Sequence, residues 1–247
     1  MHAPTQIASV TKRISMRLYG VPRFFTADYV ERATLRDGSK ALIRLVAPDD
    51  KELLRHEFGR WSPESRYARF LAPKQSLTED ELDYLVGLDQ ETHFAICALA
   101  EAGDGSGEPV GLGIARFIRL PTLALEPVTA EAAIAVADAA HRKGLGQLLL
   151  MRLCAAAAER EIERFRCEVL VENVSMQELI NVIAPEHTTS TRHGVLTIDF
   201  AIEAAAPDTP LSHPVQENAL RRFFRAAAEN TVEWTDAVRK LWRRDRD

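Results

Sequence analysis

The chain has 247 residues and a formal net charge of -5 at pH 7; 46% of its residues are hydrophobic and 27% are charged. This composition is typical of a globular protein with enough apolar material for a full core. The net negative charge does not favour binding to nucleic acid, which proteins usually bind through a basic surface. No apolar run approaches the roughly 18 to 20 residues that span a membrane. The N-terminus also lacks the apolar region of a signal peptide, so we expect a cytoplasmic protein that binds neither nucleic acid nor a membrane.

The first half of the chain alternates strand and helix patterns. Residues 31–46 alternate polar and apolar residues around an Asp-Gly pair, which predicts a hairpin. Three helices are expected after it, at 47–61, 62–71 and 78–88, and the third begins with a capping box formed by Thr78 and Glu81. Two apolar strands then flank the glycine-rich loop GDGSGE.

The second half begins with a strand at 130–139 that leads into the segment AAHRKGLGQLLL. A helix reaching about Arg160 is predicted after it by an apolar stripe at helical spacing, formed by Leu145, Leu149, Leu153, Ala156 and Ala157. A strand at 165–173, a short helix at 175–184, a loop and a last strand at 194–203 follow. This order predicts a mixed α/β fold with one central sheet.

The cysteines, histidines and two strand arginines of this chain are not expected to form a metal site, a disulfide or a substrate contact. The three cysteines lie in apolar segments without metal or disulfide spacing, so we expect buried thiols at Cys97, Cys154 and Cys167. Loop histidines without ligand spacing are expected to be exposed to solvent, namely His141, His187 and His193. His56 and His93 are expected to be structural, and Arg116 and Arg119 to lie at a solvated sheet edge.

The two glycines before the long helix predict an anion site. Unpaired backbone N–H groups at a helix N-terminus converge on an anion, and Gly144 and Gly146 have no Cβ to block a pyrophosphate. Arg142 and Lys143 add positive charge. The pattern GxxxxGK followed by Ser or Thr is absent, and Leu149 stands where a dinucleotide-binding turn needs a third glycine, so both nucleotide interpretations are excluded.

The turn His141-Arg142-Lys143-Gly144-Leu145-Gly146 resembles the acetyl-CoA pyrophosphate loop of the GNAT superfamily of N-acetyltransferases, which usually has Gln or Arg at the place of His141. The resemblance covers about residues 31–203, and SPESRYARFL, GEPVGLGIARF and AEAAIAVADAAHRKGLG resemble the bacterial protein-lysine acetyltransferase branch. It implies a mixed, mostly antiparallel sheet flanked by helices. It also implies an enzyme that transfers the acetyl group of acetyl-CoA to a primary amine, on a small molecule or a protein lysine.

This resemblance divides the chain into an N-terminal extension at 1–30, a GNAT-like acetyltransferase domain at 31–206 and a helical C-terminal extension at 207–247. The C-terminal segment has an apolar stripe at helical spacing, with acidic residues among its arginines. We expect that stripe to pack on the same chain or on a second subunit, which makes a homodimer one possible assembly.

The resemblance also implies the residues that bind acetyl-CoA. Backbone groups of one strand are expected to hold the pantetheine arm, and the turn is expected to hold the pyrophosphate. The set is Ile134, Val136, Asp138, His141, Arg142, Lys143, Gly144, Leu145, Gly146, Gln147 and Asn173. For Asn173 two roles stay open: facing the cofactor arm, or capping the helix that follows it.

Glu131 is the candidate general base. Strand alternation places it on one face with Ala133, Ala135 and Ala137, where an isolated carboxylate would have its pKa raised by desolvation. The resemblance implies that a glutamate here accepts the proton of the acceptor amine, and the alternative is a solvated carboxylate at a strand end. The helix at 175–184 has no tyrosine to act as general acid. That departure and His141 motivate an alternative function, a non-catalytic acyl-CoA-binding sensor or scaffold.

Overall fold

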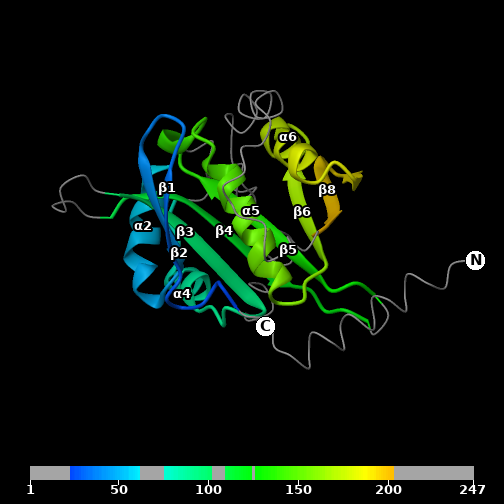
Figure 1. Cartoon of the computed structure of the whole chain (residues 1–247), viewed down its shortest axis with the longest axis horizontal. Helices are drawn as coiled ribbons and strands as arrows, with labels where there is room; N and C mark the ends of the chain where they lie inside the picture. The colour runs from blue at the N-terminus through cyan, green and yellow to red at the C-terminus, as the bar shows by residue number, and fades with distance from the viewer. Residues whose placement is uncertain (1–22, 62–74, 102–108, 124–125, 203–247) are drawn as a thin grey trace, which may run out of the picture.

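The computed structural model describes residues 23–61, 75–101, 109–123 and 126–202. Eight strands form one sheet: β1 (Val30–Thr34), β2 (Lys40–Leu45), β3 (His93–Ala100), β4 (Gly111–Arg119), β5 (Thr129–Val136), β6 (Arg164–Leu170), β7 (His187–Arg192) and β8 (Val195–Ala201). Their order is β1-β2-β3-β4-β5-β6-β8-β7, and every neighbouring pair is antiparallel except β5 and β6, which are parallel (Figure 1). The predicted mixed, mostly antiparallel sheet is therefore confirmed.

The helices are α2 (Lys51–Arg60), α4 (Glu79–Val86), α5 (Leu145–Ala158) and α6 (Val174–Ile183), with short 3-10 turns at Pro48–Asp50 and Asp138–Ala140. The predicted capping box begins α4: the Glu81 N–H donates to Thr78 Oγ1, and the Thr78 N–H donates to Glu81 Oε2. The helix expected at 62–71, the glycine-rich loop at 103–108, the C-terminal extension at 207–247 and residues 1–22 lie outside the described residues.

The segment between α6 and β8 was expected to be a loop, and this expectation is wrong. It contains β7, which pairs with β8 along its whole length. The two strands are joined by His193 and Gly194, whose φ angles of 52° and 79° are those of a tight hairpin turn. Because β7 is an edge strand with mostly exposed polar residues, it lacks the apolar alternation by which strands are recognised.

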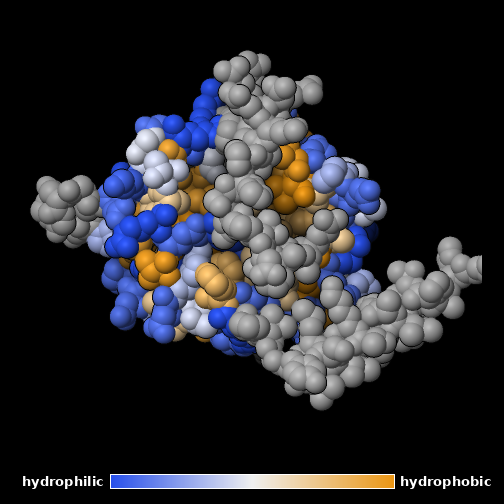
Figure 2. Space-filling view, in the orientation of Figure 1, coloured by the Kyte–Doolittle hydropathy of each residue, from blue (hydrophilic) through white to orange (hydrophobic). Residues whose placement is uncertain are grey.

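The sheet is covered by α5 on one face and by α2 and α4 on the other. The α5 stripe is fully buried, with Leu149, Leu153, Ala156 and Ala157 at 0% exposure, and Figure 1 shows α5 crossing in front of β4 and β5. Gly113 allows this close packing, since a Cβ there would lie 2.6 Å from the Ala135 carbonyl oxygen and 3.0 Å from Leu149. On the face seen in Figure 2, several separate hydrophobic patches lie inside a mostly hydrophilic rim.

A row of phenylalanines runs across the sheet beneath α5. Phe94 stacks on Phe117 with ring centroids 5.2 Å apart, and Phe117 meets Phe165 at 5.9 Å. β5 lies between the strands of the last pair and contributes only Ala130 and Ala132 to this row. Packing explains why β5 is rich in alanine. The Phe117 and Phe165 rings of the neighbouring strands fill the space above its small side chains.

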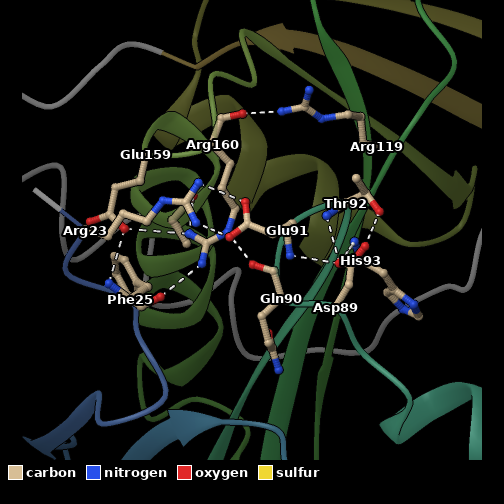
Figure 3. A network of polar contacts seen from close by, with 11 residues as sticks. Arg23, Phe25, Asp89, Gln90, Glu91, Thr92, His93, Arg119, Glu159 and Arg160 are labelled. Atoms are coloured by element: carbon tan, nitrogen blue, oxygen red, sulfur yellow. Dashed lines mark hydrogen bonds and ion pairs between the residues drawn. The ribbon is translucent and has the colours of Figure 1, made fainter. Parts of the chain in front are cut away.

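Arg160 joins three parts of the chain just beyond the end of α5 (Figure 3). It is 4% exposed, and its guanidinium donates to the carbonyl oxygens of Gln90 at 2.6 Å, Phe25 at 2.9 Å and Ala156 at 2.9 Å. It also lies 4.4 Å from the centroid of the Phe94 ring. The segment before β1, the start of β3 and the end of α5 are thereby held together.

Cys97 and Cys167 are buried free thiols, as expected, whereas Cys154, also a free thiol, is only partly buried. None of the helices within the described ranges is long and apolar enough to cross a membrane.

Candidate active site

β5 and β6 separate after a short paired stretch. They pair at three positions, ending with Glu131 opposite Arg166, although β5 continues to Val136 and β6 to Leu170. Figure 1 shows the two strands running apart beyond this point. The result is a wedge-shaped opening in the sheet, with Glu131 at its closed end and the glycine turn where β5 leads into α5.

The backbone of β5 presents unused groups to this opening. The Leu120 N–H donates to the Thr129 carbonyl and the Ala137 N–H donates to the Leu112 carbonyl, so the odd-numbered residues of β5 point their backbone groups at β4. By alternation, the N–H and C=O groups of Ile134 and Val136 point the other way, toward the opening. This is the orientation that an extended ligand needs to pair with β5 like an added strand.

His141 was expected to be exposed to solvent, and this is wrong. Its side chain is 14% exposed, and Nε2 lies 2.9 Å from the Val136 carbonyl oxygen. A carbonyl can only accept, so the proton of this hydrogen bond is on Nε2. His141 therefore ties the turn back to the end of β5. Asp138, in the 3-10 turn between them, is exposed, and its Oδ1 lies 3.8 Å from the same ring nitrogen.

The glycine turn has the backbone shape of an anion site. Gly144 is the N-cap of α5 with a φ of 82°, and Arg142, which is exposed, has a φ of 63°. The N–H groups at the start of α5, from Leu145 to Gln147, follow directly. A Cβ at Gly146 would make ordinary contacts of 3.7 Å with Val136 and 3.9 Å with Leu179, so packing within the chain does not require glycine there. An anion approaching these N–H groups is a reason for a small residue at that place.

The β1–β2 hairpin contacts this turn, a feature that the sequence did not predict. The Lys143 ammonium lies 2.8 Å from an Asp37 carboxylate oxygen, and the Arg36 N–H donates to the Lys143 carbonyl. Lys143 and the Ser39 side chain and backbone hold the pKa of the Asp37 carboxyl well below its usual range. Lys143 is therefore already paired with Asp37, and part of its charge is neutralised by that carboxylate.

Glu131 is buried, with 5% exposure, so the alternative of a solvated strand-end carboxylate is wrong. It is the third residue of β5 and lies opposite Ile118 of β4, which in turn lies opposite His93 of β3. Arg116, two residues before Ile118, is on the same face at a diagonal position, within reach of a long side chain.

Arg116 was expected at a solvated edge, but it is 2% exposed in a central strand. Its guanidinium donates to the Leu85 carbonyl at 2.8 Å and lies 3.2 Å from His93 Nε2. Burial, followed by the nearby Arg116 charge, lowers the pKa of His93 to about 3, so the ring is neutral and accepts this bond. Burial also lowers the pKa of Arg116, to about 9.

Tyr84 completes this cluster from α4. Its ring lies 5.0 Å from that of His93. Burial raises the pKa of the Tyr84 phenol; the Arg116 charge lowers it and the Glu131 charge raises it, so the phenol lies within the electric field of both groups. Sequence reasoning missed this cluster because its members are brought together by three strands and a helix, and no single segment shows a pattern.

Asn173 is the N-cap of α6, since its side-chain oxygen accepts from the Met176 N–H at 3.1 Å. The capping role is thus present, and contact with acetyl-CoA stays a prediction for this residue. In the part of the chain that the structure describes, no three His, Cys, Asp or Glu side chains are grouped so as to hold a metal ion.

The family model described as "Acetyltransferase (GNAT) family" matches residues 51–181. Acetyltransferase Pat of Mycolicibacterium smegmatis is 27% identical over 196 residues, 79% of this chain and 56% of its own length, so the chain spans little more than half of that relative. Acetyltransferase PA5475 of Pseudomonas aeruginosa is 28% identical over 59% of this chain and 75% of its own length.

Solved structures agree with the family match. The GNAT domain of S. lividans PAT superposes with a TM-score of 0.62 at 28% identity and covers 72% of this chain and 99% of its own. The yncA protein of Salmonella typhimurium, solved with its cofactor acetyl-CoA, has a TM-score of 0.51 at 18% identity, covers 69% of this chain and 99% of its own, and shows the fold alone. Together with the wedge-shaped opening and the glycine turn, the family match establishes that the chain belongs to the GNAT acetyltransferase family.

Proposed function

We propose that this chain transfers the acetyl group of acetyl-CoA to a primary amine, on a small molecule or a protein lysine, with Glu131 as general base. The observation that carries the proposal is the opening between β5 and β6. It combines a buried carboxylate at the closed end, outward-pointing backbone groups along β5, and a helix N-terminus with a glycine turn at the other end. The acetyl-CoA bound to yncA supports the choice of donor.

Each part has a chemical role. The N–H groups at the start of α5 bind the pyrophosphate, and Ile134 and Val136 pair with the arm that carries the thioester. His141 already bonds the Val136 carbonyl, which leaves the Val136 N–H and the groups of Ile134 for the ligand. Glu131 lies five residues before Val136, about 17 Å along the strand.

The reaction replaces the thioester C–S bond with an amide C–N bond. An alkylammonium has a pKa near 10.4, so it must lose a proton before its nitrogen can attack, and Glu131 accepts that proton directly or through water. CoA leaves as the thiolate and takes its proton from water. Arg116 places a positive charge on the same face of the sheet, at a position diagonal to Glu131.

The test is Glu131→Gln, which keeps the size of the side chain and removes its basicity. We expect unchanged calorimetric affinity for acetyl-CoA and a fall in kcat of about 10²-fold or more with an amine that the wild type acetylates. Glu126→Gln, at an exposed carboxylate shortly before β5, is the matched control and is expected to keep full activity. Full activity of Glu131→Gln at neutral pH would refute the base assignment. Absence of acetyl-CoA binding by the wild type would refute the donor.

A further inference from the structure

A pocket lies between α2 and the sheet, on the face of β5 that carries Glu131 and Ala135. α2 contributes Leu53 and Phe58, its C-cap residue Trp61 also lines the pocket, and the sheet contributes Leu99 and Ala135 among others. The pocket is open to solvent, and the space between its walls, with the solvent at its mouth included, is about 680 Å³. Its walls are almost entirely apolar.

Glu57 is the one charged side chain among the described residues that line this pocket. Its side chain is 14% exposed, and its Oε1 is buried and accepts no hydrogen bond from the described part of the chain. The nitrogens beside this oxygen, His56 Nδ1 at 3.7 Å and Arg60 Nη1 at 3.6 Å, are beyond hydrogen-bond distance. A buried carboxylate oxygen of this kind is stabilised by any N–H donor that reaches it from the pocket.

The sequence of β4 makes room for this carboxylate. A Cβ at Gly111 would lie 2.8 Å from Glu57 Cγ, so any larger residue there would push Glu57 from its place. Glycine at 111 and glutamate at 57 come from separate elements, and together they keep a carboxylate against an apolar wall.

These features define the class of ligand. A peptide backbone carries two polar groups per residue, and the described walls of the pocket have one charged side chain and mostly apolar neighbours to meet them, so its occupant must be mostly apolar. The Phe58 and Trp61 rings, with centroids 5.6 Å apart, suit an aliphatic chain and can also interact with a cation. The ligand is therefore an apolar chain that ends in one positive charge.

The pocket also has a defined place relative to Glu131. Ala135 lies on the same face of β5 as Glu131, four residues away, or about 14 Å along the strand. We propose that the pocket holds the non-reacting ammonium of a long aliphatic diamine at Glu57 while the other amine lies near Glu131. The acceptor role rests on the proposed function, whereas the binding of an aliphatic cation at Glu57 does not.

The first experiment measures binding without turnover. Calorimetric titrations of the full chain compare 1-aminodecane with 1-decanol, which has the same chain and no charge. We expect Glu57→Gln to weaken the binding of 1-aminodecane about tenfold or more and to leave 1-decanol unchanged. Glu52→Gln, an exposed glutamate on the same helix that pairs with Arg55, is the matched control and is expected to change neither affinity. Gly111→Ala is expected to reproduce the effect of Glu57→Gln.

The second experiment uses 1,10-diaminodecane as acceptor with acetyl-CoA. Glu57→Gln is expected to raise the KM for the diamine about tenfold, with kcat and the KM for acetyl-CoA unchanged. Equal loss of 1-aminodecane and 1-decanol binding in Glu57→Gln, or no loss of either, would overturn the site. Glu57-dependent binding of 1-aminodecane without acetylation of the diamine would keep the site and overturn its acceptor role, and Glu131→Gln tests the base independently of both.

Discussion

Replacing Arg160 with methionine tests whether the contacts beyond the end of α5 stabilise the fold. The substitution keeps an unbranched apolar stem over Phe94 and removes the guanidinium, which donates to three backbone carbonyls from three parts of the chain (Figure 3). A cation is also favoured at this place by the C-terminal end of the α5 dipole.

The expected loss follows from these contacts. Each buried carbonyl left without a donor costs about 1 to 3 kcal/mol, and the Gln90 and Phe25 carbonyls lose the donor that Arg160 provides. Losing the cation–π contact adds about 0.5 to 2 kcal/mol, while relief from burying a charge offsets part of the total. We therefore expect a loss of about 3 kcal/mol in the free energy of unfolding, which corresponds to about 6 to 12 °C in Tm for a chain of this size.

Urea unfolding followed by circular dichroism measures this loss. The matched control is Arg166→Met, because the Arg166 side chain is 44% exposed and pairs with Asp199 at 2.9 Å across β6 and β8. An exposed pair of this kind contributes about 0 to 1 kcal/mol. The two variants are compared at an equal dependence of the unfolding free energy on urea concentration. If Arg160→Met then lost no more stability than Arg166→Met, the cost assigned to the buried carbonyls without a donor would be refuted.

Further substitutions test the glycine turn, the packing of α5 and the buried histidine. Asp37→Asn frees Lys143 and is expected to lower the Kd for acetyl-CoA about two- to fivefold in calorimetry; an unchanged Kd would show that Lys143 does not contact the ligand. Gly113→Ala, with its Cβ 2.6 Å from a carbonyl oxygen, is expected to lose about 1 to 3 kcal/mol in urea unfolding, and Gly146→Ala, with contacts of 3.7 Å or more, is expected to lose none; equal effects would contradict the packing described. Because the pKa of His93 falls from an ordinary 6.5 to about 3 on folding, its contribution to stability is complete above pH 6.5 and is lost as the pH falls toward 3. His93→Gln is expected to make the urea midpoint depend less on pH over that range. An unaltered pH dependence would argue against a neutral buried ring.

Local signals in the sequence predicted much of the fold. The Thr78 and Glu81 capping box fixes the start of α4 within one turn, and the α5 stripe depends only on helical spacing. The helix ends at Ala158, two residues before the predicted end, because the following turn bonds Arg160 and Glu161 to the last carbonyls of α5 instead of continuing the helix.

What the sequence did not predict depends on contacts between distant segments. Arg116 is buried because the last turn of α4 covers it and supplies the Leu85 carbonyl. Lys143 is paired because the β1–β2 hairpin reaches the turn with Asp37. Glu131 was correctly placed on the face with Ala133 and Ala135, since strand alternation is local, but its neighbours on that face come from other strands.

The alanines of β5 have a consequence for how the opening in the sheet is set. Backbone pairing with β4 and β6 sets the sideways position of β5, and the Phe117 and Phe165 rings meet above its alanines with centroids 5.9 Å apart. Neither ring belongs to the expected acetyl-CoA site, yet changing the size of either alters the space into which β5 fits. Variation at these two positions therefore offers natural selection, or a protein engineer, a means of adjusting the packing at the closed end of the opening without changing the residues that line it.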